Sequence, residues 1–308
     1  MMYDICVFGG CSLDLFYYKD ENGNVPSSPS LIVPGGKGAN QAVAASRAGA
    51  KVTMISRIGK DDIGDKIIEN LVYNGVLTNN VEVVEELRND YAKIVIDEKN
   101  KDNDIARFSS AINSFTKDMI DGYKDVILNS KMVVAQLKVP KEVSIYLINF
   151  CYENNIPLVL TPCRPEKLKV TDEENKSLID KVTYITANKK ECETLFATDD
   201  IISCIKKYPN KLIVTLGSDG VIYYDGFEVV HVPAFSTEKI EDTTGAGDTF
   251  NGNLVACLTS GYSLYDAVVR ACYASSMKIQ KKGAQDGMPY KEELDSYIKK
   301  HSSGSVSI

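Results

Sequence analysis

The sequence predicts an α/β fold: a mostly parallel central sheet with helices on both faces and a small β-sheet lid beside it. Strand-like and helical segments alternate along most of the 308 residues, which is the order of β-α-β units. Two stretches fall outside this alternation and are expected to form the lid: the region after the first strand, at about 12–34, and a hairpin at about 91–110. We see no internal repeat and no low-complexity linker, so one domain over 1–308 is expected.

The first third of the chain gives the clearest boundaries. An apolar run ends at Gly9-Gly10 and reads as a buried strand followed by a loop. An alanine-rich segment ends at Gly49 and the next helical segment at Gly75, because glycine is favoured just past a helix C-terminus. The expected elements are a strand at 3–8, a helix at 38–48, a strand at 51–58, a helix at 62–74, and a hairpin of 91–97 with 104–109.

The rest of the chain continues the alternation and closes with two helices. The expected helices are at 115–129, 141–154, 189–196, 201–208, 248–260 and 264–278. The expected strands are at 132–137, 157–161, 184–186 and 211–215, with a late hairpin of 220–224 and 228–232. The polar tail 301–308 is expected to be frayed. In open parallel sheets ligands bind beyond the carboxyl ends of the strands, so functional residues should be sought there.

Composition excludes several functional classes. The formal charge of -7 and the lack of a basic stretch argue against nucleic-acid binding, although they do not exclude a nucleotide such as ATP. No apolar stretch approaches the roughly 20 residues of a membrane helix, and the start has no signal-peptide pattern, so a cytoplasmic protein is expected. The eight cysteines form no CxxC pair and there are two histidines, which favours reduced, buried thiols over zinc or disulfides.

The strongest local signal is DTTGAGDTF at 242–250, which opens a helix. The backbone N–H groups of Gly245, Ala246 and Gly247 can converge there, and the helix dipole adds positive charge at the same point. The string therefore predicts an anion hole with the Asp248 carboxylate at its mouth. An alternative is that Asp248 only caps the helix. The string matches neither a Walker A loop nor a dinucleotide GxGxxG motif.

A second signal is PGGKGANQ at 34–41, directly before the alanine-rich helix. Adjacent glycines let the backbone approach a ligand closely, Lys37 supplies a cation, and Asn40 supplies a donor and an acceptor. The alternative is an ordinary loop with a solvated lysine.

Together, GGKGANQAVAASRAGA and DTTGAGDTFNG resemble the two signatures of the ribokinase-like (PfkB) carbohydrate kinases, closest to the ribokinase branch of that family. The resemblance covers nearly the whole chain, because GGCSLD, TANKKE, VTLGSDG and KKGAQ also match in order. It implies transfer of the γ-phosphate of ATP to a sugar hydroxyl, with Asp248 as the base and the amides of Gly245, Ala246 and Gly247 as the anion hole.

The resemblance also implies two sets of ligand contacts. The implied sugar contacts are Ser12, Asp14, Gly36, Lys37, Asn40, Lys138 and Asp248. The implied nucleotide contacts are Asn188, Thr215, Gly217, Ser218, Gly220, Gly247 and Cys272. Ser12 replaces an asparagine of the family pattern, so one sugar contact is expected to be looser.

The resemblance further implies two metal ions. Magnesium would bridge the phosphate oxygens, with Glu191 acting near it through water. Glu191 has an equally good structural reading as the partner of Asn188 in a helix-capping box. Potassium would lie beside the anion hole, at Asp242 and Thr244 with the backbone carbonyls of Lys278, Lys281 and Gly283, and Gly287 replaces a hydroxyl ligand typical of the ribokinase branch.

The most informative departure is Lys138, where the ribokinase branch has a glutamate that contacts the sugar. A cation there favours an acidic or acceptor-rich substrate group, so we expect a substrate other than plain ribose. The alternative is that Lys138 turns to solvent. A kinase for a nucleoside or a sugar acid, and a non-catalytic sugar-binding regulatory protein on the same fold, remain the competing functions. A homodimer through the lid is expected from the resemblance.

Overall fold

The computed structural model describes residues 2–97, 99–100, 102–171, 173–237 and 239–302. Within them, a nine-stranded sheet has the order β13-β12-β11-β10-β9-β8-β1-β4-β5. Its strands are β1 (Tyr3–Phe8), β4 (Val52–Gly59), β5 (Val81–Val84), β8 (Ser130–Gln136), β9 (Leu158–Thr161), β10 (Tyr184–Asn188), β11 (Leu212–Thr215), β12 (Val221–Tyr224) and β13 (Val229–Val232). Neighbours from β5 to β11 pair in parallel, and β12 is antiparallel to both of its neighbours. The predicted α/β class and mostly parallel sheet are confirmed.

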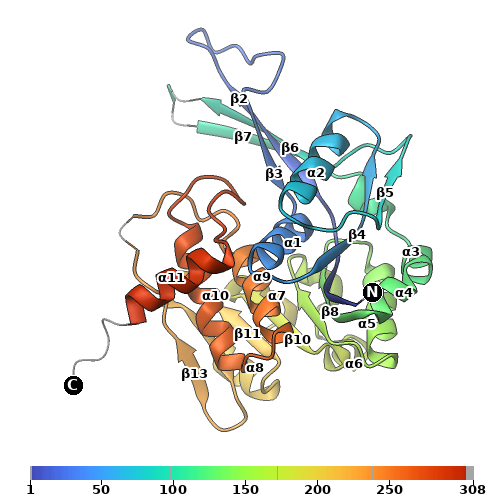
Figure 1. Cartoon of the computed structure of the whole chain (residues 1–308), viewed down its shortest axis with the longest axis vertical. Coiled ribbons are helices and arrows are strands. Elements are labelled where there is room, and N and C mark those ends of the chain that lie inside the picture. Colours follow the sequence, from blue (N-terminus) through green and yellow to red (C-terminus); the bar gives the residue numbers. More distant parts are fainter. Residues whose placement is uncertain (1, 98, 101, 172, 238, 303–308) are drawn as a thin grey trace.

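Helices cover both faces of this sheet (Figure 1). One face carries α1 (Lys37–Arg47), α2 (Asp62–Tyr73), α9 (Ala246–Thr259) and α10 (Leu264–Lys278), with α11 (Lys291–Ser302) packed on α10. The other carries α3 (Lys117–Gly122), α4 (Lys124–Leu128), α5 (Lys141–Glu153), α6 (Glu173–Lys181), α7 (Lys189–Phe196) and α8 (Ile201–Lys207). Side chains alternate between the faces along a strand: Ile5 and Val7 join the first core, Cys6 and Phe8 the second.

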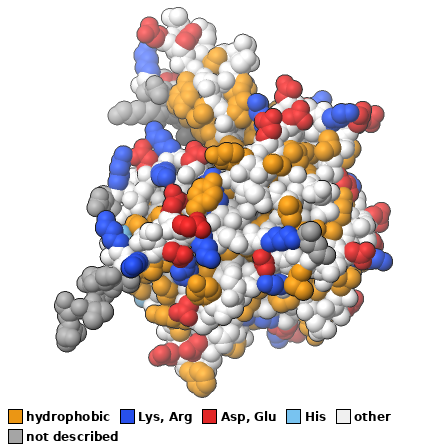
Figure 2. Space-filling model, viewed as in Figure 1, with side chains coloured by type: hydrophobic (Ala, Val, Ile, Leu, Met, Phe, Trp, Pro, Cys, Tyr) orange, Lys and Arg blue, Asp and Glu red, His pale blue; other side chains and the backbone are white. Residues whose placement is uncertain are grey.

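A second sheet projects from the main body at the top of Figure 1. It contains β3 (Leu31–Gly35), β2 (Ser12–Tyr18), β6 (Tyr91–Asp97) and β7 (Asp102–Phe108), in the order β3-β2-β6-β7. The predicted small β-sheet is therefore confirmed, and its strands lie in the two ranges from which the lid was expected. Hydrophobic side chains gather on this projection (Figure 2), among them Leu31, Ile32, Ile105 and Phe108, which are exposed.

Some expected boundaries were wrong. The single helix at 115–129 is two helices, α3 and α4, which meet at Gly122 and Tyr123, because glycine and an aromatic residue are both weak helix formers. Strand β5 and helices α6 and α11 were not predicted. Helix α11 includes His301, and the rest of the tail expected to be frayed, 303–308, lies outside the described residues. In the part of the chain that is described, no helix is long and apolar enough to span a membrane.

Candidate active site

Helices α1 and α9 pack against each other so closely that a Cβ on Gly252 would lie 2.4 Å from the Cβ of Ala44. One turn earlier on each helix, Asn40 contacts Asp248. Going from the first contact to the second means moving one turn toward the N-terminus on each helix. Helices α1 and α9 therefore run side by side in the same direction, and their N-termini meet. Two helix dipoles then point their positive ends at one place, which favours an anion there.

The Asp248 carboxylate lies at this meeting point, and the residue is 6% exposed. Its Oδ2 accepts a hydrogen bond from Asn40 Nδ2 at 2.9 Å, and its Oδ1 accepts one from Gln41 Nε2 at 3.0 Å. Asp248 therefore does not cap its own helix: the structure records no side-chain cap at the α9 N-terminus. Two neutral amides instead fix the position of the carboxylate.

Three glutamines that the sequence analysis did not single out complete this arrangement. Gln285 Nε2 donates to Asn40 Oδ1 at 2.8 Å, and Gln136 Nε2 donates to Gln41 Oε1 at 2.8 Å. Each acceptor oxygen is thereby engaged elsewhere, which leaves the NH₂ group of Asn40 and of Gln41 facing Asp248. Their positions in the sequence could have pointed to these glutamines, because Gln136 ends a buried strand and Gln41 and Gln285 lie inside the matched motifs.

The predicted anion hole is present in part. Gly245 has φ 80° and a Cβ there would lie 2.3 Å from the carbonyl oxygen of Ala284, so only glycine fits. The Ala246 N–H donates to Thr243 O at 3.2 Å and is already engaged. The N–H groups of Gly245 and Gly247 have no acceptor among the described residues, and a Cβ on Gly247 would meet open space. Two of the three expected amides can therefore receive an anion.

Lys37, at the first position of α1, brings a cation to the same place. Burial lowers the pKa of Lys37, but the charges of Asp248, Cys163 and Glu191 outweigh burial and leave that pKa above its ordinary value. The ammonium is therefore protonated at neutral pH and near the base. Burial raises the pKa of the neighbouring Cys163 thiol to about 11, so this thiol stays protonated.

Both members of the possible capping box are in place. Asn188 Oδ1 accepts from the Glu191 N–H at 2.9 Å, and Glu191 Oε2 accepts from the Asn188 N–H at 3.0 Å, so the structural reading of this pair is confirmed. Burial raises the pKa of Glu191, Lys37 opposes that rise and Asp248 adds to it. Glu191 Oε1 accepts no hydrogen bond within the described ranges, so one oxygen stays available.

The expected sugar contacts lie between the first strands and the α1 N-terminus. Gly36 has φ 92°, and a Cβ there would be 2.7 Å from the Ser12 backbone nitrogen. Ser12 and Asp14 side-chain oxygens both lie next to Gly35. Burial raises the pKa of Asp14, while the positive charges of Arg107 and Lys138 oppose that rise.

Lys138 is partly buried just after β8, and its charge acts on Asp14, Asp90 and Cys163. The Lys138 charge therefore opposes the rise in the pKa of Asp14, one of the expected sugar contacts.

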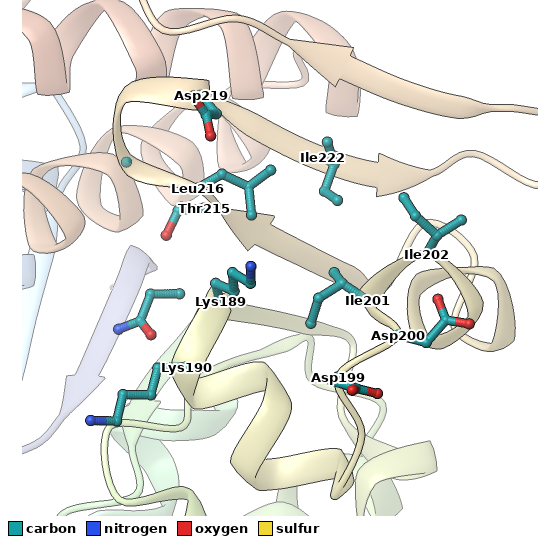
Figure 3. Close-up of a pocket in the computed structure, with 12 residues that line it drawn as sticks. Lys189, Lys190, Asp199, Asp200, Ile201, Ile202, Thr215, Leu216, Asp219 and Ile222 are labelled. Atoms are coloured by element: carbon teal, nitrogen blue, oxygen red, sulfur yellow. The ribbon is translucent and has the colours of Figure 1, made fainter.

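Three of the expected nucleotide contacts, Asn188, Thr215 and Gly217, line a cavity of about 600 Å³ (Figure 3). Lys189 extends into this cavity from the start of α7, whereas Lys190 points away. Ser218 and Gly220 belong to the same loop as Gly217. Cys272 lies elsewhere: it is buried in an apolar cluster on α10, where burial raises its pKa to about 12.

The five positions expected around potassium do come together, but an ammonium is already among them. Lys278 is 0% exposed, and its Nζ donates to Asp242 O at 2.7 Å and to Lys281 O at 3.4 Å. The Asp242 carboxylate accepts from the N–H groups of Thr244 (2.8 Å) and Gly283 (2.9 Å). The residues therefore do not fit a bound monovalent cation. No group of three or more His, Cys, Asp or Glu side chains suited to a metal occurs within the described residues.

Comparisons with known proteins identify the family of this chain. The family described as "pfkB family carbohydrate kinase" matches residues 2–291. The ribokinase of Lactococcus lactis is 39% identical over 306 residues, covering 97% of this chain and 98% of the relative. That of Bacillus subtilis is 36% identical over 301 residues, covering 96% and 100%.

Solved structures give the same picture for the fold. The structure of Arabidopsis thaliana ribokinase complexed with ribose and ATP has a TM-score of 0.84 at 23% identity, covering 97% of this chain and 99% of that one. Ribokinase from Thermotoga maritima has a TM-score of 0.81 at 27% identity, covering 97% and 100%. The fold is ribokinase-like, and the chain belongs to the pfkB family of carbohydrate kinases.

Proposed function

We propose that this carbohydrate kinase transfers the γ-phosphate of ATP to a hydroxyl group of a small sugar in the cytoplasm, with Asp248 as the catalytic base. The observation that carries the proposal is the Asp248 carboxylate, held by Asn40 and Gln41 where two helix N-termini meet. The relatives named ribokinase and the Arabidopsis complex with ribose and ATP support the same reaction class.

The site offers a side chain or backbone amide for each step of the reaction. Asp248 accepts the proton of the sugar hydroxyl, whose oxygen attacks the γ-phosphorus while the bond to the ADP oxygen breaks. The free amides of Gly245 and Gly247 and the Lys37 ammonium stabilise the negative charge of the transferring group. The neutral amides of Asn40 and Gln41 hold the Asp248 carboxylate in position for this proton transfer.

Magnesium belongs to the same proposal. Mg²⁺ would offset the negative charge of the nucleotide phosphates, and Glu191 would help to hold it. The free Oε1 of Glu191 is the nearby oxygen suited to hold it through water, since the second oxygen, Oε2, is engaged by the Asn188 N–H. We do not extend the proposal to potassium, because Lys278 takes the carbonyl oxygens that the ion would use.

Two ligand sites follow from the placement of the remaining residues. The sugar lies against Ser12, Asp14, Gly36, Asn40 and Lys138, and the nucleotide against Asn188, Thr215 and the 217–220 loop. Cys272 is left out because it is packed in an apolar cluster. With Lys138 beside Asp14, the preferred sugar carries an acidic or acceptor-rich group and is not plain ribose.

We also propose a homodimer through the lid. The exposed apolar side chains on that sheet support the dimer, because burying them against a second copy of the chain would remove apolar surface from water.

The test is a coupled assay of ADP release by the purified protein over a panel of pentoses, hexoses, sugar acids and nucleosides. Asp248→Asn keeps the size of the side chain but removes the base, and should lower kcat by about 10²- to 10⁴-fold while sugar binding persists. Asp180→Asn is the matched control: Asp180 is exposed on α6, on the opposite face of the sheet, and its replacement should leave kcat unchanged. Turnover that survives in Asp248→Asn removes this residue from the base role. If the wild-type protein binds sugar but releases no ADP, the alternative of a non-catalytic, regulatory sugar-binding protein is correct.

A further inference from the structure

Lys278, the last residue of α10, is among the largest side chains that are fully buried. Burying an ammonium costs several kcal/mol unless strong partners replace its water. A lysine at a helix C-terminus usually extends into solvent, so this burial calls for a specific reason.

The partners of the Lys278 ammonium are backbone carbonyl oxygens: Asp242 O at 2.7 Å and Lys281 O at 3.4 Å. Carbonyl oxygens arranged around a single positive charge are the environment that proteins offer a dehydrated potassium ion. Burial lowers the pKa of Lys278, and the nearby charges of Asp242 and Asp286 oppose that shift.

The surrounding backbone leaves no room for a side-chain ligand at position 287. A Cβ on Gly287 would lie 2.4 Å from the carbonyl oxygen of Lys278, so no residue with a side chain, and no hydroxyl ligand, fits at this position. An ion at the Asp242 carbonyl would also face the Lys278 ammonium across a few ångströms, where like charges repel.

This ammonium is linked to the anion hole through the backbone of Asp242. Asp242 begins the 242–247 loop, and its carboxylate also accepts from the Gly283 N–H, which ties the loop to the 281–287 segment. Gly245 of the loop packs on Ala284 O, and Ser275 Oγ of α10 donates to Ala246 O at 3.0 Å. A charge that orders Asp242 therefore also sets the direction of the amides at 245 and 247.

We infer that the Lys278 ammonium is a built-in monovalent cation that positions the 242–247 loop, so that turnover needs no potassium. Lys278 is a positioning residue, since it reaches the phosphoryl group only through the loop. This inference rests on the proposed kinase activity. Its advantage is physical: a tethered ammonium is always present, whereas an ion must be bound from solution.

The first test uses the unmodified protein. At constant ionic strength, rates in potassium and in tetramethylammonium should agree within about twofold, whereas an activating effector typically changes an equilibrium by about 5- to 150-fold. The melting temperature should also be equal in the two salts, because nothing binds the native state preferentially. A several-fold higher rate or a higher melting temperature in potassium overturns the inference. The melting measurement needs no turnover, so it stays decisive if no sugar is phosphorylated and the proposed function fails.

The second test makes the protein dependent on a cation. Lys278→Ala should lose at least about tenfold in kcat in tetramethylammonium, and potassium or methylammonium should restore most of it by filling the vacated place. Lys282→Met, an exposed neighbouring lysine, is the control and should stay fully active in both salts. A folded Lys278→Ala protein whose loss is the same in every salt shows a merely structural role and overturns the inference. If that variant does not fold, the wild-type comparison decides.

Discussion

At the scale of single residues, the site is organised by amides. Gln285 donates to Asn40, Gln136 donates to Gln41, and both recipients donate to the Asp248 carboxylate. Both donors to the base are therefore neutral amides, and the two glutamines behind them fix the orientation of those amides.

Lys138→Glu tests the substrate preference at the same scale. It restores the acceptor found in the ribokinase branch, and the Lys138 charge is felt by Asp14 next to the sugar contacts. The ratio of kcat/KM for ribose over the preferred acidic or acceptor-rich sugar should rise by about tenfold or more, which corresponds to ~1.4 kcal/mol of differential binding. Lys141→Glu, exposed at the start of α5, is the control and should leave the ratio unchanged. Efficient phosphorylation of ribose by the wild type, clearly above other sugars, contradicts the proposal.

What could be predicted at this scale depended on local pattern. The sequence predicted Asp248, Asn40 and Lys37 as site residues, because they lie in motifs whose glycines and helix N-termini indicate a ligand site. The supporting glutamines were not predicted, since only the packing of α1, β8 and the 281–287 segment brings them together. Nor does any local pattern show that Lys278 points inward: a lysine in a last helical turn is ordinarily solvated.

At the scale of elements, the site depends on how closely α1 and α9 approach. The contact between Gly252 and Ala44 lies one turn below the pair of Asn40 and Asp248. A change in helix spacing at Gly252 must therefore alter the distance between the base and its amide donors. Small residues along α1 serve this spacing, since Ala42, Val43, Ala44 and Ala45 are all buried.

Gly252→Ala tests this coupling between stability and catalysis. The added Cβ would lie 2.4 Å from Ala44 Cβ and 2.7 Å from the Ala45 nitrogen, so the helices must separate. We expect a loss of about 1–3 kcal/mol in the free energy of unfolding, measured in urea, together with a lower kcat. Gly122→Ala is the matched control, because its Cβ meets open space at the end of α3 and should be neutral or stabilising by up to ~1 kcal/mol. Equal behaviour of the two variants contradicts this account.

The order of elements was more predictable than their ends. The apolar runs of buried parallel strands and the glycines after helices are clear sequence signals, so every strand of the main sheet except β5 could be predicted from the chain alone. Strand β3 falls in the range from which the lid was expected, but its ends could not be predicted because it follows a polar, proline-rich stretch. The break between α3 and α4 needed tertiary context that a helical pattern does not contain.

At the scale of the whole molecule, the lid projects from the main sheet. Its strand β2 carries Ser12 and Asp14, and its strand β3 ends just before Gly36. Its four strands leave β3 and β7 as edges, and an exposed edge strand with apolar side chains invites pairing with another chain. A partner on this sheet would shield apolar surface and hold the sugar-contacting strands in place at once. The lid is thus the part of the molecule where assembly and substrate binding can be coupled.

The double variant Leu31→Lys and Ile105→Lys tests assembly through the lid. Both side chains are exposed, at 48% and 40%, and charges there would have to be buried without partners in a dimer. By light scattering, the wild type should have twice the 33.9 kDa mass of the chain, and the variant the mass of a monomer. Phe227→Lys, at 93% exposure in the turn between β12 and β13, should leave the dimer intact. A monomeric wild type, or a variant that still dimerises, would place any assembly elsewhere. If the variant is monomeric and its KM for sugar rises while kcat is unchanged, the partner stabilises the lid over the substrate and has no part in the chemical step.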